Sequence, residues 1–258
     1  MIKKIQPKTK NDIAAMAEGG KRLSEIKMEL WNEVEIGKSP WDIEVLANKL
    51  IKKTGGTASF KMVDNYYWAT CVNINKVVVH GIPKKEIVFK KGDVVSVDVG
   101  LFYKGFHTDT SFTVGLSVSD EIKKFIETGS RVLKKALNSA VEKNRIYDIS
   151  KELQKVEEDG YSVVKSLVGH GIGRKLHEEP FIPCFVSKKR QDTLEIPLYA
   201  TFALEIMYAM GSGEIETESD GWTIVTQDGK ISALFEETVA VCEHGPFVLT
   251  KTNLDLVK

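Results

Sequence analysis

The spacing of apolar residues predicts that the chain begins with two helices. Between Asn11 and about Val34, apolar side chains recur at helical intervals, which is typical of an amphipathic helix. A second helix is expected to start after Ser39, because Pro40 suits the first helical position and Asp42 completes a capping box. Gly55-Gly56 should end it.

Extended segments follow these helices. The stretches "TCVNINKVVVHG" and "DVVSVDVGLFYKGFHTDTSFTVG" are rich in β-branched residues, and Lys104-Gly105 suits a hairpin turn between two strands. A long helix is then predicted, capped by Ser119 or Asp120 and marked by apolar residues as far as Val141. A shorter helix should end at Gly160.

Strands return in the last third, in "YSVVKSLVG", "YATFALEIMYAM", "GWTIVT" and "ISALFEETVAVC", with a turn expected at Asp228-Gly229. Two helices followed by strands thus occur twice, and the seam falls near residues 115 to 120. No linker separates the halves, at about 11–115 and 116–250. We therefore expect a single α+β domain over residues 1–258, with antiparallel sheet and flanking helices.

Composition narrows the class of protein. The 258 residues are 42% hydrophobic and 28% charged, and 36 basic side chains balance 36 acidic ones, so no overall field favours nucleic acid or an anionic membrane. The three cysteines lack CxxC spacing, which argues against a disulfide framework. No apolar run suggests a signal peptide or a membrane span. We predict a cytoplasmic protein.

Four carboxylates interrupt the predicted strands. Asp98 lies on the face opposite Val95, Val97, Val99 and Leu101, and Asp109, Glu205 and Glu236 also occur within strands. A single strand carboxylate is explained by a solvated face. Two in each half suggest instead that the acids converge in a cleft between the halves. Buried like charges need a cation, and carboxylates with a histidine suit divalent Mn, Fe, Co or Zn.

The segment "SLVGHGIGRKLHEEP", residues 166 to 180, holds His170 and His177 among glycines. The spacing excludes a helical HExxH zinc motif, and the glycines fit neither the dinucleotide nor the P-loop pattern. They suggest a backbone bent tightly around a site, which leaves His170 free to ligate and His177 free to reach a substrate. An ordinary glycine-rich turn with solvent-facing histidines is the alternative.

Together, these residues resemble the methionine aminopeptidases, and residues 220 to 238 resemble the type I branch. The resemblance covers the chain from about Asn11 to Thr250. It is carried by an ordered set of seven residues: His80, Asp98, Asp109, His170, His177, Glu205 and Glu236. The resemblance implies the pita-bread fold, in which two pseudo-symmetric α+β halves enclose a dinuclear metal centre.

The resemblance also implies a ligand set for two divalent ions, whether Co, Mn, Fe or Zn. Asp98 would ligate one metal, and His170 and Glu205 the other. Asp109 and Glu236 would bridge both ions.

Catalytic and substrate-binding roles follow from the same resemblance. Glu205 would act as general base, His177 would donate to the scissile carbonyl oxygen, and His80 would contact the peptide nitrogen or the chain beyond it. The methionine pocket would be formed by these residues: Tyr66, Cys71, Leu176, Trp222, Phe60 and Val63.

Several positions depart from the family pattern. An aromatic residue is common where Leu176 stands, and a Tyr-Pro pair where Tyr66-Tyr67 stands, and the segment around Val63 is also unusual. Ile206 replaces a proline after Glu205, and Glu237 replaces a histidine after Glu236. None of these changes removes a ligand, but several touch the walls that select methionine.

The predicted function is metal-dependent removal of the initiator methionine from nascent proteins whose second residue is small. The altered pocket keeps open an enzyme with another N-terminal preference, such as Xaa-Pro peptides. A third alternative is a non-catalytic peptide-binding relative. The expected partner is the N-terminal peptide of a nascent protein, with possible transient contact with the ribosome, and the chain is expected to be a monomer.

Overall fold

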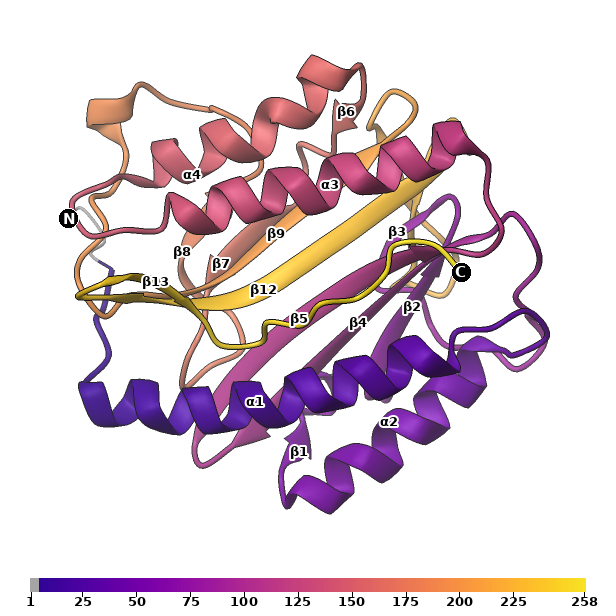
Figure 1. Ribbon diagram of the computed structural model, residues 1–258, viewed down its shortest axis with the longest axis horizontal. Helices are drawn as coiled ribbons and strands as arrows, with labels where there is room; N and C mark the ends of the chain where they lie inside the picture. The colour runs from indigo at the N-terminus through magenta and orange to yellow at the C-terminus, as the bar shows by residue number, and fades with distance from the viewer. Residues whose placement is uncertain (1–4) are drawn as a thin grey trace.

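A computed structural model describes residues 5–258 and shows ten antiparallel strands in one sheet that runs through both halves of the sequence (Figure 1). The main path is β1-β4-β5-β12-β9-β7-β8, with β2 paired to β4, β6 to β9 and β13 to β12. These strands are β1 (Thr57–Ala58), β2 (Thr70–Ile74), β4 (Val94–Tyr103), β5 (Phe106–Gly115), β6 (Ser162–Val163), β7 (Val168–Gly171), β8 (Glu178–Pro183), β9 (Thr201–Ala209), β12 (Ser232–Cys242) and β13 (Gly245–Val248). The seam between the halves lies where β5 meets β12.

A small second sheet and the helices complete the fold. The three-stranded sheet contains β3 (Val77–Val79), β10 (Ile215–Thr217) and β11 (Ile224–Thr226). The α-helices are α1 (Lys10–Glu33), α2 (Pro40–Thr54), α3 (Asp120–Asn138) and α4 (Ile146–Leu153), and the 3-10 turns are η1 (Phe60–Met62), η2 (Gln154–Asp159) and η3 (Arg190–Asp192). No helix within residues 5–258 is both long and apolar enough to cross a bilayer.

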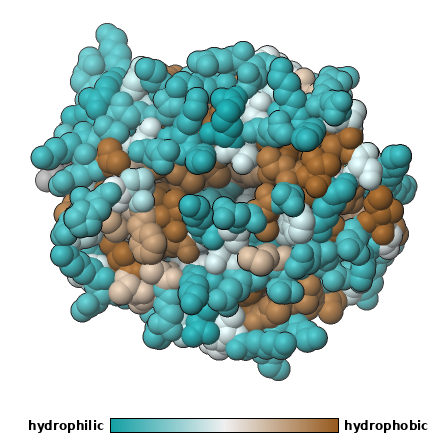
Figure 2. Space-filling view, in the orientation of Figure 1, coloured by the Kyte–Doolittle hydropathy of each residue, from teal (hydrophilic) through white to brown (hydrophobic). Residues whose placement is uncertain are grey.

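The helices cover one face of the large sheet. α1 packs on β4 and β5, α3 packs on β9 and β12, and the C-terminal segment runs between them (Figure 1). Seen from that side, hydrophilic side chains cover most of the molecule, and hydrophobic ones gather in separate patches (Figure 2). The opposite face of the sheet is therefore left for the predicted cleft.

The alternation predicted for "DVVSVDVGL" is confirmed. Val97 and Val99 of β4 pack with Leu23 and Leu30 of α1, and all four side chains have no exposed surface. Full burial of such a side chain contributes about 1.5–3 kcal/mol, so this face anchors the first half of the sheet. Asp98, between the two valines, necessarily points to the other face.

The second helix begins and ends where the sequence predicted. Ser39 is its N-cap, and its hydroxyl and the Asp42 side chain form the expected capping box. Gly55 ends the helix with φ 75°, a left-handed conformation that glycine adopts without steric cost. The Lys104-Gly105 turn is likewise confirmed, since β4 and β5 pair along their whole length around it.

Several predicted boundaries were wrong. The long helix ends at Asn138, so Ala140 and Val141 lie beyond it, although Ala140 is fully buried in the core. Burial rather than helical structure accounts for that apolar residue. The helix expected to run to Gly160 changes at Leu153 into the 3-10 turn η2, which ends at Gly160 with φ 87°.

The late strands also differ in detail. "YSVVKSLVG" splits into β6 and β7 around a turn at residues 165–166. The turn at Asp228-Gly229 exists, but the strands that it joins, β11 and β12, belong to different sheets. β8, β10 and β13 were not anticipated, and β8 carries Pro180 and Pro183, which weaken a strand pattern.

Gly129 of α3 offers a test of how tightly the second half is packed. A Cβ at this position would lie 2.5 Å from Cε1 of the fully buried Tyr208 and 2.8 Å from Cδ2 of Phe235. We expect Gly129→Ala to lower the free energy of unfolding by about 1–3 kcal/mol, because overpacking outweighs the gain in helix propensity. Urea denaturation measures this, with the exposed Glu127→Ala as control; a more stable Gly129→Ala would contradict the packing argument.

Candidate metal centre

Strand register brings the four predicted carboxylates to one place. Across β4, β5, β12 and β9, cross-strand neighbours form the row Asp98, Ser111, Glu236 and Glu205. Asp109 precedes Ser111 by two residues and therefore shares its face of β5. Each half of the sequence contributes two acids, and the row crosses the seam between β5 and β12.

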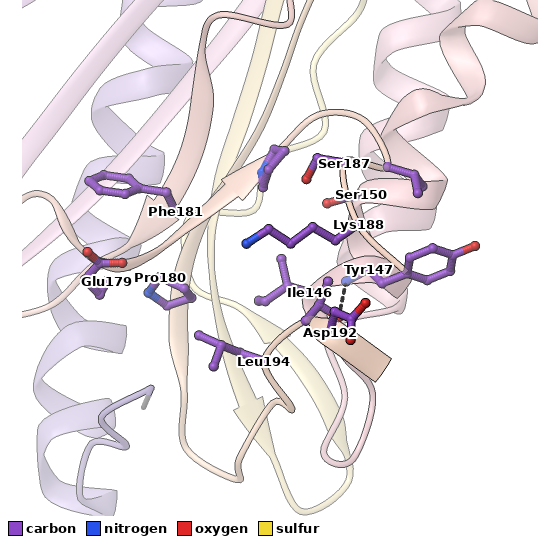
Figure 3. Close-up of a pocket in the computed structure, with 13 residues that line it drawn as sticks. Ile146, Tyr147, Ser150, Glu179, Pro180, Phe181, Ser187, Lys188, Asp192 and Leu194 are labelled. Atoms are coloured by element: carbon purple, nitrogen blue, oxygen red, sulfur yellow. Dashed lines mark hydrogen bonds between the residues drawn. The ribbon is translucent and has the colours of Figure 1, made fainter. Parts of the chain in front are cut away.

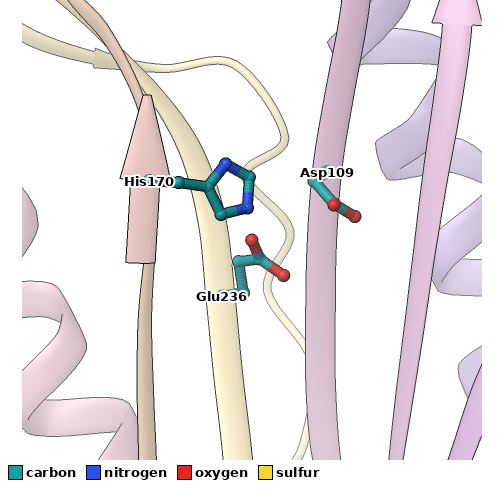
Figure 4. A group of neighbouring side chains, drawn as sticks. All are labelled: Asp109, His170 and Glu236. Atoms are coloured by element: carbon teal, nitrogen blue, oxygen red, sulfur yellow. The ribbon is translucent and has the colours of Figure 1, made fainter. Parts of the chain in front are cut away.

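The predicted histidine ligand reaches this row from β7. His170 pairs with Ala203, which lies two residues before Glu205 on the same face of β9. Figure 4 shows His170, Glu236 and Asp109 converging from three strands, and one ligand atom from each lies within 4.8 Å of the others. The glycine beside His170 permits this approach: a Cβ on Gly169 would lie 2.8 Å from the Ala203 carbonyl oxygen.

Gly169 and Gly171 thus act differently from our expectation of a bend, whereas Gly173 begins the bend that the chain makes at residues 173–177. Gly169 and Gly171 lie within strand β7. A Cβ on Gly171 would lie 2.5 Å from the carbonyl oxygen of Glu179. Both glycines serve close packing between strands, and β7 carries His170 into the site as part of the sheet.

All the predicted site residues line one cavity of about 260 Å³. Its polar side is formed by the four acids with His80, His170 and His177. Its apolar side consists of Phe60, Val63, Tyr66, Cys71, Val79, Leu167, Val168, Leu176, Phe181, Met207 and Trp222, with Ser166 also at the wall. A polar cluster beside an apolar wall is the arrangement expected of a site that binds one apolar side chain and acts next to it.

The four carboxylates destabilise one another's charged forms. Burial raises the pKa of Asp98 to about 7. Burial, and then the charges of Asp98 and Glu205, raise the pKa of Asp109 well above its usual range. The pKa values of Glu205 and Glu236 are raised for the same reasons, burial first and neighbouring carboxylates second. Such a cluster favours a cation.

Two oxygens of this cluster also lack hydrogen-bond donors. Within residues 5–258, Asp98 Oδ1 and Glu236 Oε1 are buried without a partner, as is Ser111 Oγ. Buried polar atoms are normally satisfied, and carboxylate oxygens left bare in a cluster of acids are suited to bind metal. The donor set therefore fits a divalent ion.

His170 has the orientation that a ligand needs. Its Nδ1 lies 2.9 Å from the carbonyl oxygen of Gly171, which only accepts hydrogen bonds, so Nδ1 carries the proton and Nε2 presents its lone pair. Burial lowers the pKa of His170 to about 4, which keeps the ring neutral. The ring centroids of His177 and His170 lie 4.5 Å apart, and the planes of the two rings are inclined at 74°.

His80 and His177 lie at the accessible part of the cavity. Both side chains are solvent-accessible, yet the partial desolvation there lowers the pKa of each. His80 has φ 58°, a left-handed conformation. Its ring meets that of Trp222 edge to face, with the ring centroids 6.4 Å apart. Neutral imidazoles at the mouth can donate or accept a hydrogen bond to a bound peptide.

The predicted side-chain pocket forms a packed aromatic wall. The buried Tyr66 donates to the carbonyl oxygen of Thr70 at 3.0 Å, its hydroxyl lies 3.1 Å from Cys71 Sγ, and its ring meets Trp222 edge-on at 5.1 Å. Leu176 is 8% exposed and closes the wall. Burial raises the pKa of Cys71 well above its usual range, so this thiol does not act as a nucleophile.

The positions that depart from the family pattern fall into different environments. Val63 and Leu176 line the cavity, whereas Tyr67 is 69% exposed outside it. Ile206 is fully buried in the core of the second half. Glu237 points away from the acids and forms an ion pair with the buried Lys27. The sequence did not predict this pair.

Ser111 was also missed, although it stands between Asp98 and Glu236 in the row. Its spacing of two from Asp109 on a strand was the signal that could have revealed it. His107 accords with an ordinary structural histidine, since it is buried and its Nδ1 lies 2.9 Å from the Ser59 hydroxyl.

A second hollow lies next to the site, between β8 and α4 (Figure 3). It has a volume of about 210 Å³ and shares Phe181 with the cavity, but none of the predicted site residues lines it. The chemistry is therefore concentrated in the cavity that holds the acids and histidines.

Comparison with known proteins identifies the family of this chain. Residues 14–243 match the metallopeptidase family M24. A methionine aminopeptidase from Clostridium perfringens is 40% identical over 94% of this chain and 97% of its own length. A crystal structure of methionine aminopeptidase from Thermotoga maritima matches with a TM-score of 0.92 and 37% identity, covering 96% of this chain and all of that one.

The fold is shared more widely than the activity. An X-Pro aminopeptidase structure from Thermotoga maritima has a TM-score of 0.75 at 21% identity and covers 98% of this chain but 64% of its own. That likeness shows the fold alone. The full-length similarity to bacterial methionine aminopeptidases confirms the predicted resemblance and fold, and the chain belongs to the methionine aminopeptidases of metallopeptidase family M24.

Proposed function

We propose that this chain, as a single catalytic domain, hydrolyses the peptide bond after the N-terminal methionine of peptides and nascent proteins with a small second residue. The observation that carries the proposal is the row of strand carboxylates, with bare buried oxygens, at the side of an apolar cavity. Family M24 membership implies metal ions. The free cysteines and the class of substrate are consistent with a cytoplasmic enzyme.

The chain's own residues supply the ligands for two divalent ions. Asp98 would hold one ion, and His170 and Glu205 the other. Asp109 and Glu236, which face each other across the seam, would bridge them. When bound, such a pair lowers the pKa of a bound water and polarises a carbonyl oxygen.

The remaining steps belong to side chains at the cavity. Glu205 accepts the proton of the attacking water at a carboxylate oxygen and returns it to the leaving amine. His177 donates a hydrogen bond to the scissile carbonyl oxygen as negative charge develops there, and His80 orients the peptide through its nitrogen. The methionine side chain enters the apolar wall formed by Tyr66, Cys71, Leu176, Trp222, Phe60 and Val63.

The first test is release of methionine from Met-Ala and Met-Gly peptides, with Ala-Pro and Leu-Ala peptides as comparison substrates. The protein is stripped with a chelator and then resupplied with Mn, Fe or Co. We expect metal-restored cleavage of the methionyl peptides only. Preference for Ala-Pro or Leu-Ala would contradict the methionine assignment, and no cleavage of any substrate would leave a non-catalytic binding protein.

His177 provides a test of the transition-state contact. We expect His177→Ala to lower kcat by about a hundredfold or more with a much smaller change in KM, because the hydrogen bond strengthens only as charge develops. The matched control is His244→Ala, which removes an exposed histidine that does not line the cavity. Steady-state kinetics decide, and unchanged kcat in His177→Ala would refute the role.

Metal removal should expose the repulsion among the acids. We expect chelation to lower the Tm of the wild type, whereas metal-free Asp98→Asn should exceed the metal-free wild type by on the order of 1 kcal/mol, or about 2–4 °C. Added metal should then raise the Tm of Asp98→Asn by less than it raises the Tm of the wild type. Calorimetry measures all four states, with the exposed Glu142→Gln as control. If metal-free Asp98→Asn were less stable than the metal-free wild type, the result would argue against repulsion among the four carboxylates.

A further inference from the structure

The seam between the two halves is held by little backbone pairing. β4 and β5 pair from end to end, as do most of β9 and β12, but β5 and β12 share the two register pairs Glu236↔Ser111 and Glu237↔Thr110. Asp109 and Glu236 stand on opposite sides of this short junction. Their separation therefore depends on contacts other than a continuous ladder.

Threonine side chains supply part of that connection. Thr110 Oγ1 donates to the Glu236 carbonyl oxygen at 2.9 Å, and Thr238 Oγ1 donates to the Asp109 carbonyl oxygen at 2.8 Å. The backbone N–H of Asp109 donates to Thr238 Oγ1 at 2.8 Å. The backbones that carry the two predicted bridging ligands are thus tied by side chains of the opposite strand.

A buried ion pair lies directly behind this junction. Lys27 of α1 is 2% exposed, and its ammonium group donates to Glu237 Oε1 at 2.6 Å and to Thr110 Oγ1 at 2.8 Å. Thr250 Oγ1 donates to the second carboxylate oxygen of Glu237. A buried ammonium requires such a partner, because an unpaired charge away from water is strongly unfavourable.

These contacts link the first half to the second on the helix side of the sheet. Lys27 belongs to α1, which packs on β4 and β5, and Glu237 belongs to β12. Glu237 follows Glu236 directly, so its side chain points to the face away from the cavity. The pair touches neither the cavity nor a predicted ligand atom.

We propose that Lys27 and Glu237 form a clamp that fixes the distance between Asp109 and Glu236 and so sets the affinity of the site for divalent metal. Both are positioning residues, and the inference rests on the metal centre proposed above. The clamp acts through the two strands: Lys27 holds Thr110 beside Asp109, and Glu237 holds the strand that carries Glu236.

Two single variants distinguish positioning from long-range charge. Loss of Lys27 removes a positive charge near the site, which by charge alone would strengthen cation binding, whereas loss of Glu237 would weaken it. If geometry decides, both changes weaken binding. The structure therefore predicts the same sign for Lys27→Met and Glu237→Gln, and recovery when they are combined, because the double variant leaves no unpaired charge.

The experiment measures the Mn²⁺ dissociation constant of the chelator-stripped full chain by titration calorimetry. We expect each single variant to bind Mn²⁺ about tenfold or more weakly and the double variant to recover most of the loss. Tighter or unchanged binding by Lys27→Met overturns the clamp. A wild type that binds no Mn²⁺ refutes the metal centre itself, and the clamp with it.

Controls separate this effect from general stability. Gly129→Ala should lower stability without changing Mn²⁺ affinity. Lys104→Met is the control for loss of a lysine charge, because it removes an exposed ion pair with Glu18 on the protein surface. Should Lys27→Met fail to fold, Thr250→Val keeps both charges and nearly the same shape. It removes the hydrogen bond to Glu237 and the acceptor of the Thr238 backbone N–H. Thr250→Val should also weaken Mn²⁺ binding, and unchanged affinity in that variant would overturn the proposal.

Discussion

The repulsion among four carboxylates at the cavity, three of them buried, is the constraint on which the rest of this structure depends. Burial raises the pKa of each of these acids, neighbouring carboxylates raise the pKa of Asp109, Glu205 and Glu236 further, and two oxygens of the cluster have no donor within residues 5–258. A protein would not gain stability from such a cluster in the absence of a cation. The cluster is therefore explained by what it binds, and the fold must supply the stability that it removes.

The fold supplies this stability on the other face of the sheet. β4 shows the division of labour most clearly, because Val97 and Val99 enter the helix-covered core while Asp98 between them faces the cavity. On β12, Glu236 faces the acids and Glu237 pairs with Lys27 on the helix side. Each strand thus contributes apolar packing and metal-site chemistry by simple alternation.

The positions that depart from the family pattern acquire separate meanings in this arrangement. Leu176 and Val63 are walls of the cavity, so they bear on which side chain is accepted. Ile206 belongs to the core, and Glu237 is neutralised by a lysine from a distant helix. The unusual residues therefore have three separate roles: some line the cavity that selects the side chain, one packs in the core, and one helps to position the strands.

The sequence by itself indicated the duplication, the second helix with its capping box and the β4–β5 hairpin, because these depend on local periodicity and on residue chemistry. The same chemistry singled out the four strand carboxylates, His170 and His177, whereas the full list of seven site residues rested on the resemblance to the family. Tertiary structure alone decided which cross-strand neighbours form the row, since register between distant strands leaves no local signal. It also decided that Ala140 is buried outside a helix and that Ser111 stands between two acids. The pairing of Lys27 with Glu237, 210 positions away, depends on the packing of α1 against the seam, which no local pattern encodes.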